Sequence, residues 1–379
     1  MKTPLALRNL VHERVRAGVA VAGVAFAVVL ILMQLGFFFS VARTATLVYD
    51  RLNFDLAIVS SDYLHMGKAG MIPLERLYQA QDLPEVAGAS PFWVSFNLWL
   101  NPDPRSHQRR SMMILAFRPD DAVVNLPEVE KYRNDLKELR TVLVDRLSRP
   151  EFGPHGPGVS TDIGQTAVRV IGEYTMGTGF SADGAVMTSD RTLFMITPML
   201  PRNRATLGLI SLRPGTNARR VKERLEQLLP QDSQVMTHDE LNRYEQHHWV
   251  VKTSVGVIFG LGVGVALVVG LAIVYQVLSS DIANRMPEYA TLMAMGYGRR
   301  YISGVVLQQA VLMALAGFVP GWLVSYVLFK VAAAGANLPM AMTPALTLAV
   351  LALNLTMCVT SGLLSLRKVN TADPADLFT

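Results

Sequence analysis

Four stretches of this 379-residue chain are long, apolar and free of charged side chains. A helix needs about 20 apolar residues to cross a bilayer, and a helix satisfies its own backbone hydrogen bonds there. The stretches are Ala17–Ala42, Thr253–Ser280, Tyr301–Phe329 and Val331–Leu366. We therefore predict a membrane protein with four transmembrane α-helices. A large polar segment, residues 43–252, is inserted between helices 1 and 2.

The charged residues are distributed unevenly between this segment and the rest of the chain. Residues 43–252 contain 25 basic and 25 acidic residues, which leaves 10 of 35 basic and 5 of 30 acidic residues elsewhere. Nine of these ten basic residues flank the apolar stretches: Lys2, Arg8, Arg14, Arg16, Arg285, Arg299, Arg300, Arg367 and Lys368. Basic residues concentrate on the cytoplasmic side of membrane proteins. We expect both termini and residues 281–300 in the cytoplasm, and residues 43–252 and 330–343 outside it. A nucleic-acid surface would instead concentrate positive charge on the soluble domain.

The predicted domains follow from these boundaries. They are a cytoplasmic amphipathic N-terminal helix (1–16), transmembrane helix 1 (17–42), an extracytoplasmic (periplasmic) α+β domain with a stalk (43–252), transmembrane helix 2 (253–280), a cytoplasmic segment (281–300), transmembrane helix 3 (301–329), a periplasmic loop (330–343), transmembrane helix 4 (344–366) and a cytoplasmic tail (367–379). Two alternatives stay open near the N-terminus. Residues 1–16 could extend the first membrane helix, and Ser40-Val41-Ala42 resembles a signal-peptide cleavage site, although 26 apolar residues exceed the usual signal length.

The outer segment alternates strand-like and helical patterns, which predicts an α+β domain that could be divided into two lobes. Expected strands cover 55–61, 111–117, 141–145, 168–172, 206–212 and 233–237, and expected helices cover 73–81 and 217–229. Gly- and Pro-rich residues 149–158 and 177–184 are expected loops. Residues 43–49 and 238–252 contain no helix breaker, so we expect them to form a helical stalk that continues the flanking membrane helices.

No catalytic or cofactor-binding motif is present in the sequence. The chain lacks a GxxxxGK[ST] phosphate loop and the HExxH, CxxC and GxSxG patterns, so it is not by itself a P-loop ATPase. His247-His248 and His238-Asp239-Glu240 contain metal-ligand types, but adjacent histidines on one helix point in different directions. We expect no catalytic residue, no metal and no cofactor in this chain.

Two of the apolar stretches carry small residues at four-residue spacing. Gly256, Gly260 and Gly264 recur in the second stretch, and Gly317 and Gly321 in the third. Such faces allow membrane helices to approach closely. The pattern predicts helix packing, either within one subunit or across a dimer.

The cytoplasmic segment is unusually apolar for a linker. Asp281 is a candidate N-cap, Pro287 can start a second short helix, and Gly296 is a candidate C-terminal stop. Leu292, Met293 and Met295 form an apolar knob suited to docking in a groove of a partner.

The same segment carries a family resemblance. Arg285 and residues 288–297 resemble the coupling segment of the FtsX/MacB-type ABC transporter permeases, as do the opening 5–10 and the tail 366–378. Residues 237–241, Glu245, 248–249, 253–264, 273–278 and Cys358 are similar to the DevC type, the permease of the heterocyst glycolipid exporter. The resemblance is weaker over 66–202.

This resemblance implies a bacterial inner-membrane homodimer that works with a separate ABC ATPase, which binds the ATP and magnesium. It also implies a periplasmic adaptor protein and a TolC-like outer-membrane channel, with export of a lipid, glycolipid or other hydrophobic cargo. The residues it assigns to ATPase coupling are Arg285, Glu288, Tyr289, Leu292, Met293, Met295 and Gly296. The alternatives are an FtsX-like regulatory scaffold that controls a periplasmic cell-wall hydrolase, and a signalling receptor, which the absence of a cytoplasmic output domain disfavours.

Overall fold

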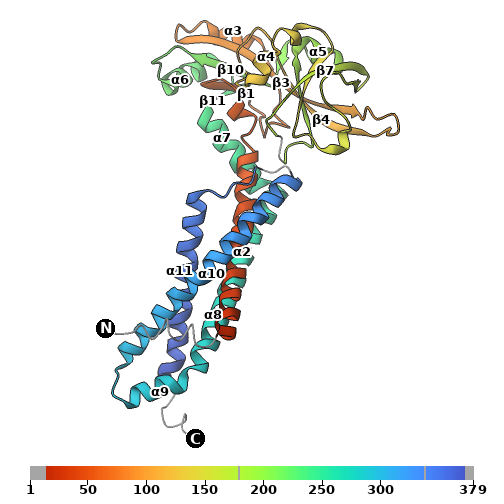
Figure 1. The fold of residues 1–379 in the computed structure, drawn as a ribbon. Helices are drawn as coiled ribbons and strands as arrows, with labels where there is room; N and C mark the ends of the chain where they lie inside the picture. Colours follow the sequence, from red (N-terminus) through yellow and green to blue (C-terminus); the bar gives the residue numbers. More distant parts are fainter. Residues whose placement is uncertain (1–13, 178–179, 337–338, 372–379) are drawn as a thin grey trace. The chain divides into compact units, whose positions relative to one another are not determined.

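The computed structural model describes residues 14–177, 180–336 and 339–371, and the expected N-terminal amphipathic helix lies largely outside them. The described chain forms two compact units (Figure 1). One is helical and takes its residues from Met1–Ser40, Val257–Ala336 and Met340–Thr379. The other, from Val41–Gly256 and Asn337–Pro339, is the outer domain. The two lobes expected within the outer domain are not separate units.

The helical unit contains four helices that are long and apolar enough to cross a membrane. They are α2 (Arg14–Thr44), α8 (Ser254–Asn284), α10 (Arg299–Ala336) and α11 (Pro344–Thr371), and the short α9 (Met286–Ala294) lies between α8 and α10. α10 runs seven residues beyond the expected end at Phe329, so the connection before α11 is shorter than predicted.

The outer domain is built on a nine-stranded mixed sheet in the order β11-β1-β10-β3-β4-β8-β5-β7-β6. Its strands are β1 (Leu56–Ser60), β3 (Val86–Leu100), β4 (Arg109–Phe117), β5 (Thr141–Asp145), β6 (Ser160–Ile163), β7 (Thr166–Tyr174), β8 (Ala185–Ser189), β10 (Leu207–Leu212) and β11 (Ser233–Thr237). A separate two-stranded sheet pairs β2 (Ile72–Pro73) with β9 (Arg204–Ala205). The strands at each of the six expected positions are confirmed to within a few residues.

The helices of the outer domain are short. They are α3 (Glu75–Gln81), α4 (Pro127–Lys131), α5 (Asp190–Ile196), α6 (Ala218–Leu228) and α7 (His238–His247), with 3₁₀ turns η1 (Tyr49–Arg51), η2 (Asp135–Lys137) and η3 (Pro150–Phe152). The N-cap of α6 is Asn217, whose side-chain oxygen accepts hydrogen bonds from the backbone N–H groups of Arg219 and Arg220.

β3 is the longest strand and connects two parts of the sheet. Its first half pairs with β10 and its second half with β4. β6 returns to pair with β3 at Trp99 and Ile163, so the strands β3, β4, β8, β5, β7 and β6 form a closed ring. No strand was predicted over residues 86–100, although apolar and polar residues alternate over 94–98 with the period of a strand.

The sheet has a hydrophobic core on each face. In β4, Met113, Leu115 and Phe117 belong to one core, and Met112, Ile114 and Ala116 to the other. Successive strand side chains point to opposite faces, so strands buried on both faces read as continuous apolar runs. α3 and α6 pack in the second core through Leu77 and Leu225, and α7 packs in the first through Leu241.

The two segments expected to form a helical stalk are interrupted. α2 ends at Thr44, and turns lead into η1. After α7, His248–Lys252 forms a π-helix, and Thr253 is extended, with φ −93° and ψ 151°. The Thr253 hydroxyl donates to the Trp249 carbonyl at 2.6 Å and accepts from the Gly256 N–H at 3.2 Å. Thr253 is therefore the N-cap of α8, and the expectation of one uninterrupted helix through residue 252 is wrong.

Candidate functional site

Between α8 and α10 lies one short helix, α9, and Asp281 is a residue of α8 rather than the predicted N-cap of this helix. α8 continues through Asp281 to Asn284, and α9 starts at Met286 with Pro287 in its first turn. Proline lacks a backbone donor and is tolerated at this position. α9 ends in a glycine stop. Gly296 has φ 91°, and the Tyr297 N–H donates to the Leu292 carbonyl at 3.1 Å. This six-to-one hydrogen bond is typical of a Schellman motif, so the predicted stop at Gly296 has a structural basis.

α9 is held against the neighbouring helices by a small apolar cluster. The buried members are Ile282, Ile302, Val305 and Val306, and Met286 and Leu292 pack against them. Leu292 thus faces α8 and α10 and anchors α9. This corrects the expectation that Leu292 belongs to an exposed knob.

The side chains of α9 that remain accessible are different ones. The Met295 side chain is 62% exposed and so is that of Glu288. Tyr297 packs on Tyr301 with ring centroids 4.8 Å apart, and both rings are partly exposed. A partner protein could therefore contact Glu288 near the start of α9 and the flexible Met295 side chain just after its end.

The remaining residues of the predicted coupling set have mixed placements. Arg285 is 7% exposed, and its guanidinium lies 3.9 Å from the Glu288 carboxylate. The side chains of Tyr289 and Met293 lie outside what the structure describes. The structure therefore brings Arg285, Glu288, Leu292, Met295 and Gly296 together at α9, with only part of this set accessible.

The glycine pair on α10 lies against α2. A Cβ atom at Gly317 would lie 2.6 Å from Val24 Cβ, and one at Gly321 would lie 2.8 Å from the Ala25 carbonyl oxygen. Real Cβ atoms do not approach other atoms so closely, so only glycine allows this helix contact.

The three glycines predicted on α8 do not form one packing face within the chain. A Cβ atom at Gly256 would collide with the carbonyl oxygens of Trp249 and Val250, because the π-helix folds back on the first turn of α8. At Gly260 the nearest atom is a Phe38 ring carbon at 3.6 Å, an ordinary contact, and at Gly264 no atom lies within 4 Å.

A second set of small residues on α8, offset by two positions, makes the contacts instead. A Cβ atom at Gly262 would collide with the Gln34 side chain, Ala266 is buried, and one at Gly270 would lie 3.3 Å from Ile31 Cδ1. The sequence analysis missed this face, although its four-residue spacing is the same. As a prediction for packing within one subunit, the face of Gly260 and Gly264 is wrong. The alternative of a dimer contact remains a prediction.

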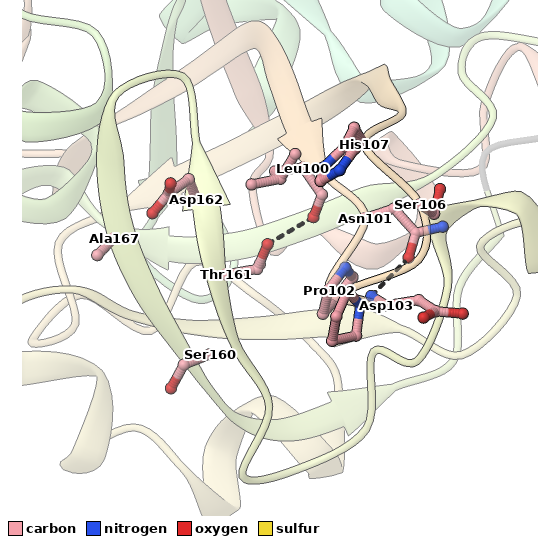
Figure 2. Close-up of a pocket in the computed structure, with 11 residues that line it drawn as sticks. Leu100, Asn101, Pro102, Asp103, Ser106, His107, Ser160, Thr161, Asp162 and Ala167 are labelled. Carbon is pink, nitrogen blue, oxygen red and sulfur yellow. Dashed lines mark hydrogen bonds between the residues drawn. The ribbon is translucent and has the colours of Figure 1, made fainter.

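The outer domain has a surface pocket of about 370 Å³ at the end of the β3–β4 hairpin (Figure 2). Two of its polar groups are used in local hydrogen bonds. The Thr161 hydroxyl donates to the Leu100 carbonyl, and the Asn101 side-chain oxygen accepts from the Asp103 N–H at 2.9 Å. The groups do not converge on a common point, and we do not assign the pocket a ligand.

The histidine-containing motifs have local structural partners. Thr237 and Glu240 form a capping box at the start of α7, and Glu240 also accepts from Lys222 at 2.7 Å. His238 packs on Phe54, with centroids 4.9 Å apart. His248 stacks on His65 at 4.7 Å. His65 lies far away in the sequence, and no local pattern indicated this pair.

Comparison with known protein families gives one match, which lies in the helical part of the chain. Residues 260–374 match the family model described as FtsX-like permease C-terminal. No curated protein matches the chain.

Three solved structures show a distant similarity to about half of the chain. The periplasmic region of MacB from Actinobacillus actinomycetemcomitans is 10% identical, with a TM-score of 0.37, over 50% of this chain and 92% of that one. The extracellular domain of the noncanonic ABC-type transporter YknZ from Gram-positive bacteria is 11% identical, with a TM-score of 0.34, over 48% and 99%. A domain of a putative permease from Porphyromonas gingivalis is 13% identical, with a TM-score of 0.32, over 49% and 89%.

The family match includes α9 and most of α8, α10 and α11, and thus the whole candidate site. The chain is accordingly a multi-pass membrane protein that carries an FtsX-like permease C-terminal domain over residues 260–374.

Proposed function

We propose that the chain is the membrane subunit of an ABC exporter that passes the motion of a separate ATPase to the outer domain. The observation that carries this proposal is α9. It is a short helix outside the apolar segments, anchored by Leu292 and Met286, and it presents Glu288 and Met295 to solvent within the FtsX-like region. A helix fixed on one side and exposed on the other can move with a partner that binds its exposed side.

The rest of the assembly follows from the resemblance and belongs to the same proposal. The ATPase would bind ATP and magnesium, and two copies of this chain would form a homodimer in the inner membrane with both termini in the cytoplasm. A periplasmic adaptor and a TolC-like outer-membrane channel would complete a route for a lipid, glycolipid or other hydrophobic cargo. The uncharged membrane segments support this assignment, because ion-coupled transporters usually carry ionisable groups there.

The test is ATPase recruitment by α9 variants. Met295→Asp places a charge where the partner groove would exclude water, and an unpaired buried charge costs several kcal/mol. We expect the affinity of the purified permease for its ATPase to fall at least about 100-fold. Glu288→Lys should weaken binding less, because Glu288 is exposed and its charge can remain solvated.

The matched control is Met199→Asp in the outer domain, where Met199 is 94% exposed. This variant should bind the ATPase normally. Leu292→Asp is a poorer probe, because it also breaks the anchoring cluster of α9. Normal recruitment and stimulation of the ATPase by Met295→Asp would show that α9 is not the coupling element.

A further inference from the structure

Three buried polar side chains meet inside the outer domain. They are Tyr49 from η1, Tyr63 from the turn after β1, and Glu245 from α7, and they are 0%, 3% and 0% exposed. The Tyr63 hydroxyl donates to Glu245 Oε1, and the Tyr49 hydroxyl donates to the same oxygen at 3.2 Å. The two hydroxyl groups also contact each other. The Tyr244 hydroxyl donates to the Tyr63 carbonyl at 3.0 Å and ties α7 to the same turn.

The carboxylate of Glu245 is only half satisfied by this arrangement. Oε2 is buried and has no hydrogen-bond partner in the part of the chain that the structure describes. The Met66 N–H and the Trp249 indole also lower the pKa of Glu245, although neither has the geometry of a hydrogen bond to Oε2. Burial raises the pKa of Glu245 to about 7, against the opposing effect of the two tyrosine hydroxyls. A buried carboxylate gains a proton when its hydrogen bonds do not offset the cost of burying the charge.

The cluster lies close to both points at which the chain connects the outer domain to the membrane helices. Tyr49 follows the end of α2 by five residues, and Glu245 precedes the start of α8 by nine. The chain therefore enters and leaves the outer domain beside the same carboxylate. Directly after α7 come the π-helix and the extended residue Thr253. π-helices are rare and are enriched at functional positions.

Other titratable groups lie beside the cluster on the neighbouring elements. Tyr244 on α7 acts on Tyr63, and His238 Nε2 lies 3.3 Å from the Tyr49 carbonyl oxygen. A second group, which interacts within itself, comprises His65 and Lys68 in the loop after β1 and His247, His248 and Lys252 after it in the chain. Burial lowers the pKa of both His65 and His248. The His65 pKa is lowered further by His248, and the His248 pKa by Lys252. Protonation of these imidazoles at acid pH would separate the stacked rings, which is opposite to the effect expected at Glu245.

We propose that Tyr49, Tyr63 and Glu245 form a proton-sensitive latch that fastens both connections of the outer domain, residues 45–51 and 245–253, to its core. The latch is closed when Glu245 carries a proton and loosens when the carboxylate ionises and draws in water. The latch does not depend on ATPase binding, so a negative result for the latch would leave the proposed coupling role of α9 untouched, and the reverse also holds.

The direction of the pH effect follows from the raised pKa. The closed form holds its proton up to about pH 7, whereas an opened, solvated glutamate has a pKa near 4.5. The contribution of Glu245 to closure is therefore complete below pH 4.5 and is lost as the pH rises from 4.5 to 7. Above pH 7 both forms are ionised, and the opening equilibrium levels off.

Hydrogen exchange of the full-length protein in lipid nanodiscs tests the latch. Protection of residues 44–52, 61–69 and 241–253 is measured from pH 5 to 8 and divided by the intrinsic exchange rate at each pH. We compare wild type with Glu245→Gln, which keeps an acceptor for both tyrosines but cannot ionise. Dividing the opening constant of the wild type by that of Glu245→Gln cancels the histidine contribution. This ratio should rise more than tenfold between pH 5 and 7 and then level off.

Two further variants make the result decisive. Asp239→Asn, at an exposed position of α7, should keep the wild-type pH dependence. Tyr63→Phe removes a donor that favours the ionised carboxylate, which raises the pKa of Glu245 further. The opening constant of this variant should therefore level off at a higher pH than that of the wild type. A hydroxyl with a purely structural role would instead lower protection equally at every pH. The same pH dependence in wild type and Glu245→Gln overturns the proposal. If Glu245→Gln loses protection throughout the domain, Tyr63→Phe provides the test instead: a plateau at higher pH supports the proposal, and an unshifted plateau overturns it.

Discussion

The glycine pair on α10 and the three glycines on α8 share one spacing and have different surroundings. Gly317 and Gly321 both meet α2 at distances that exclude a side chain. On α8, Gly256 meets the carbonyl oxygens of the preceding π-helix, Gly260 meets a ring at 3.6 Å and Gly264 meets nothing. A four-residue spacing of glycines thus identifies a smooth helix face, but it does not show that another helix of the same chain covers that face.

Among the glycines that lie against another membrane helix, the largest effect should come from Gly321→Leu. Its Cβ would lie 2.8 Å from the Ala25 carbonyl oxygen and 2.9 Å from Val28 Cβ, and backbone cannot move aside as a side-chain tip can. Overpacking of this kind costs about 3 kcal/mol or more. We expect a clearly lower melting temperature for the nanodisc-reconstituted protein. A wild-type melting curve would mean that α10 and α2 do not pack as described.

Gly262→Leu should have an intermediate effect that exceeds that of Gly260→Leu. The new side chain at 262 meets the Gln34 side-chain amide, which can swing away, so we expect a loss of about 1–2 kcal/mol. At 260 the Phe38 ring lies at an ordinary contact distance. The same melting experiment on both variants checks the order. An equal or reversed order would restore the Gly260 face as the packing face within the chain.

Gly264→Leu should have the smallest effect on the single chain, below about 0.5 kcal/mol, because no atom lies within 4 Å of the added Cβ. The informative measurement is the oligomeric state at equal detergent and protein concentration. If the open face is the homodimer contact, Gly264→Leu should shift the protein toward monomer while its melting temperature stays unchanged. Gly304→Leu, at another open position on α10, is the matched control. Unchanged dimerisation would place the contact on another face.

Much of the fold was predictable from local pattern. The four apolar helices and the strands β1, β4, β5, β7, β10 and β11 follow from runs of apolar residues of the right length. The α6 helix follows from the spacing of its apolar residues. The capping box of α7 was not predicted, although Thr237 and Glu240 have its spacing. These features depend on neighbours within a few residues, so the sequence carries them directly.

The features that the sequence did not reveal depend on contacts between distant parts of the chain. Thr253 is an exception, because the hydrogen bonds that make it the cap of α8 go to Trp249 and Gly256, only four and three residues away. The partners of Glu245 are 196 and 182 residues away, so no spacing rule links them. Gly260 and Gly262 are indistinguishable as residue types, and the position of α2 alone decides which of them is covered.

The shared strand β3 has a consequence for how the outer domain unfolds. Its 15 residues pair with β10 at one end and with β4 and β6 at the other, so releasing either end removes ladder hydrogen bonds that the other end needs for alignment. A sheet joined in this way loses its structure cooperatively, and regions that unfold together exchange their amide hydrogens at a common rate. The slowest-exchanging amides of β1 and β5, which lie on opposite sides of β3 in the strand order, should therefore report a single opening free energy.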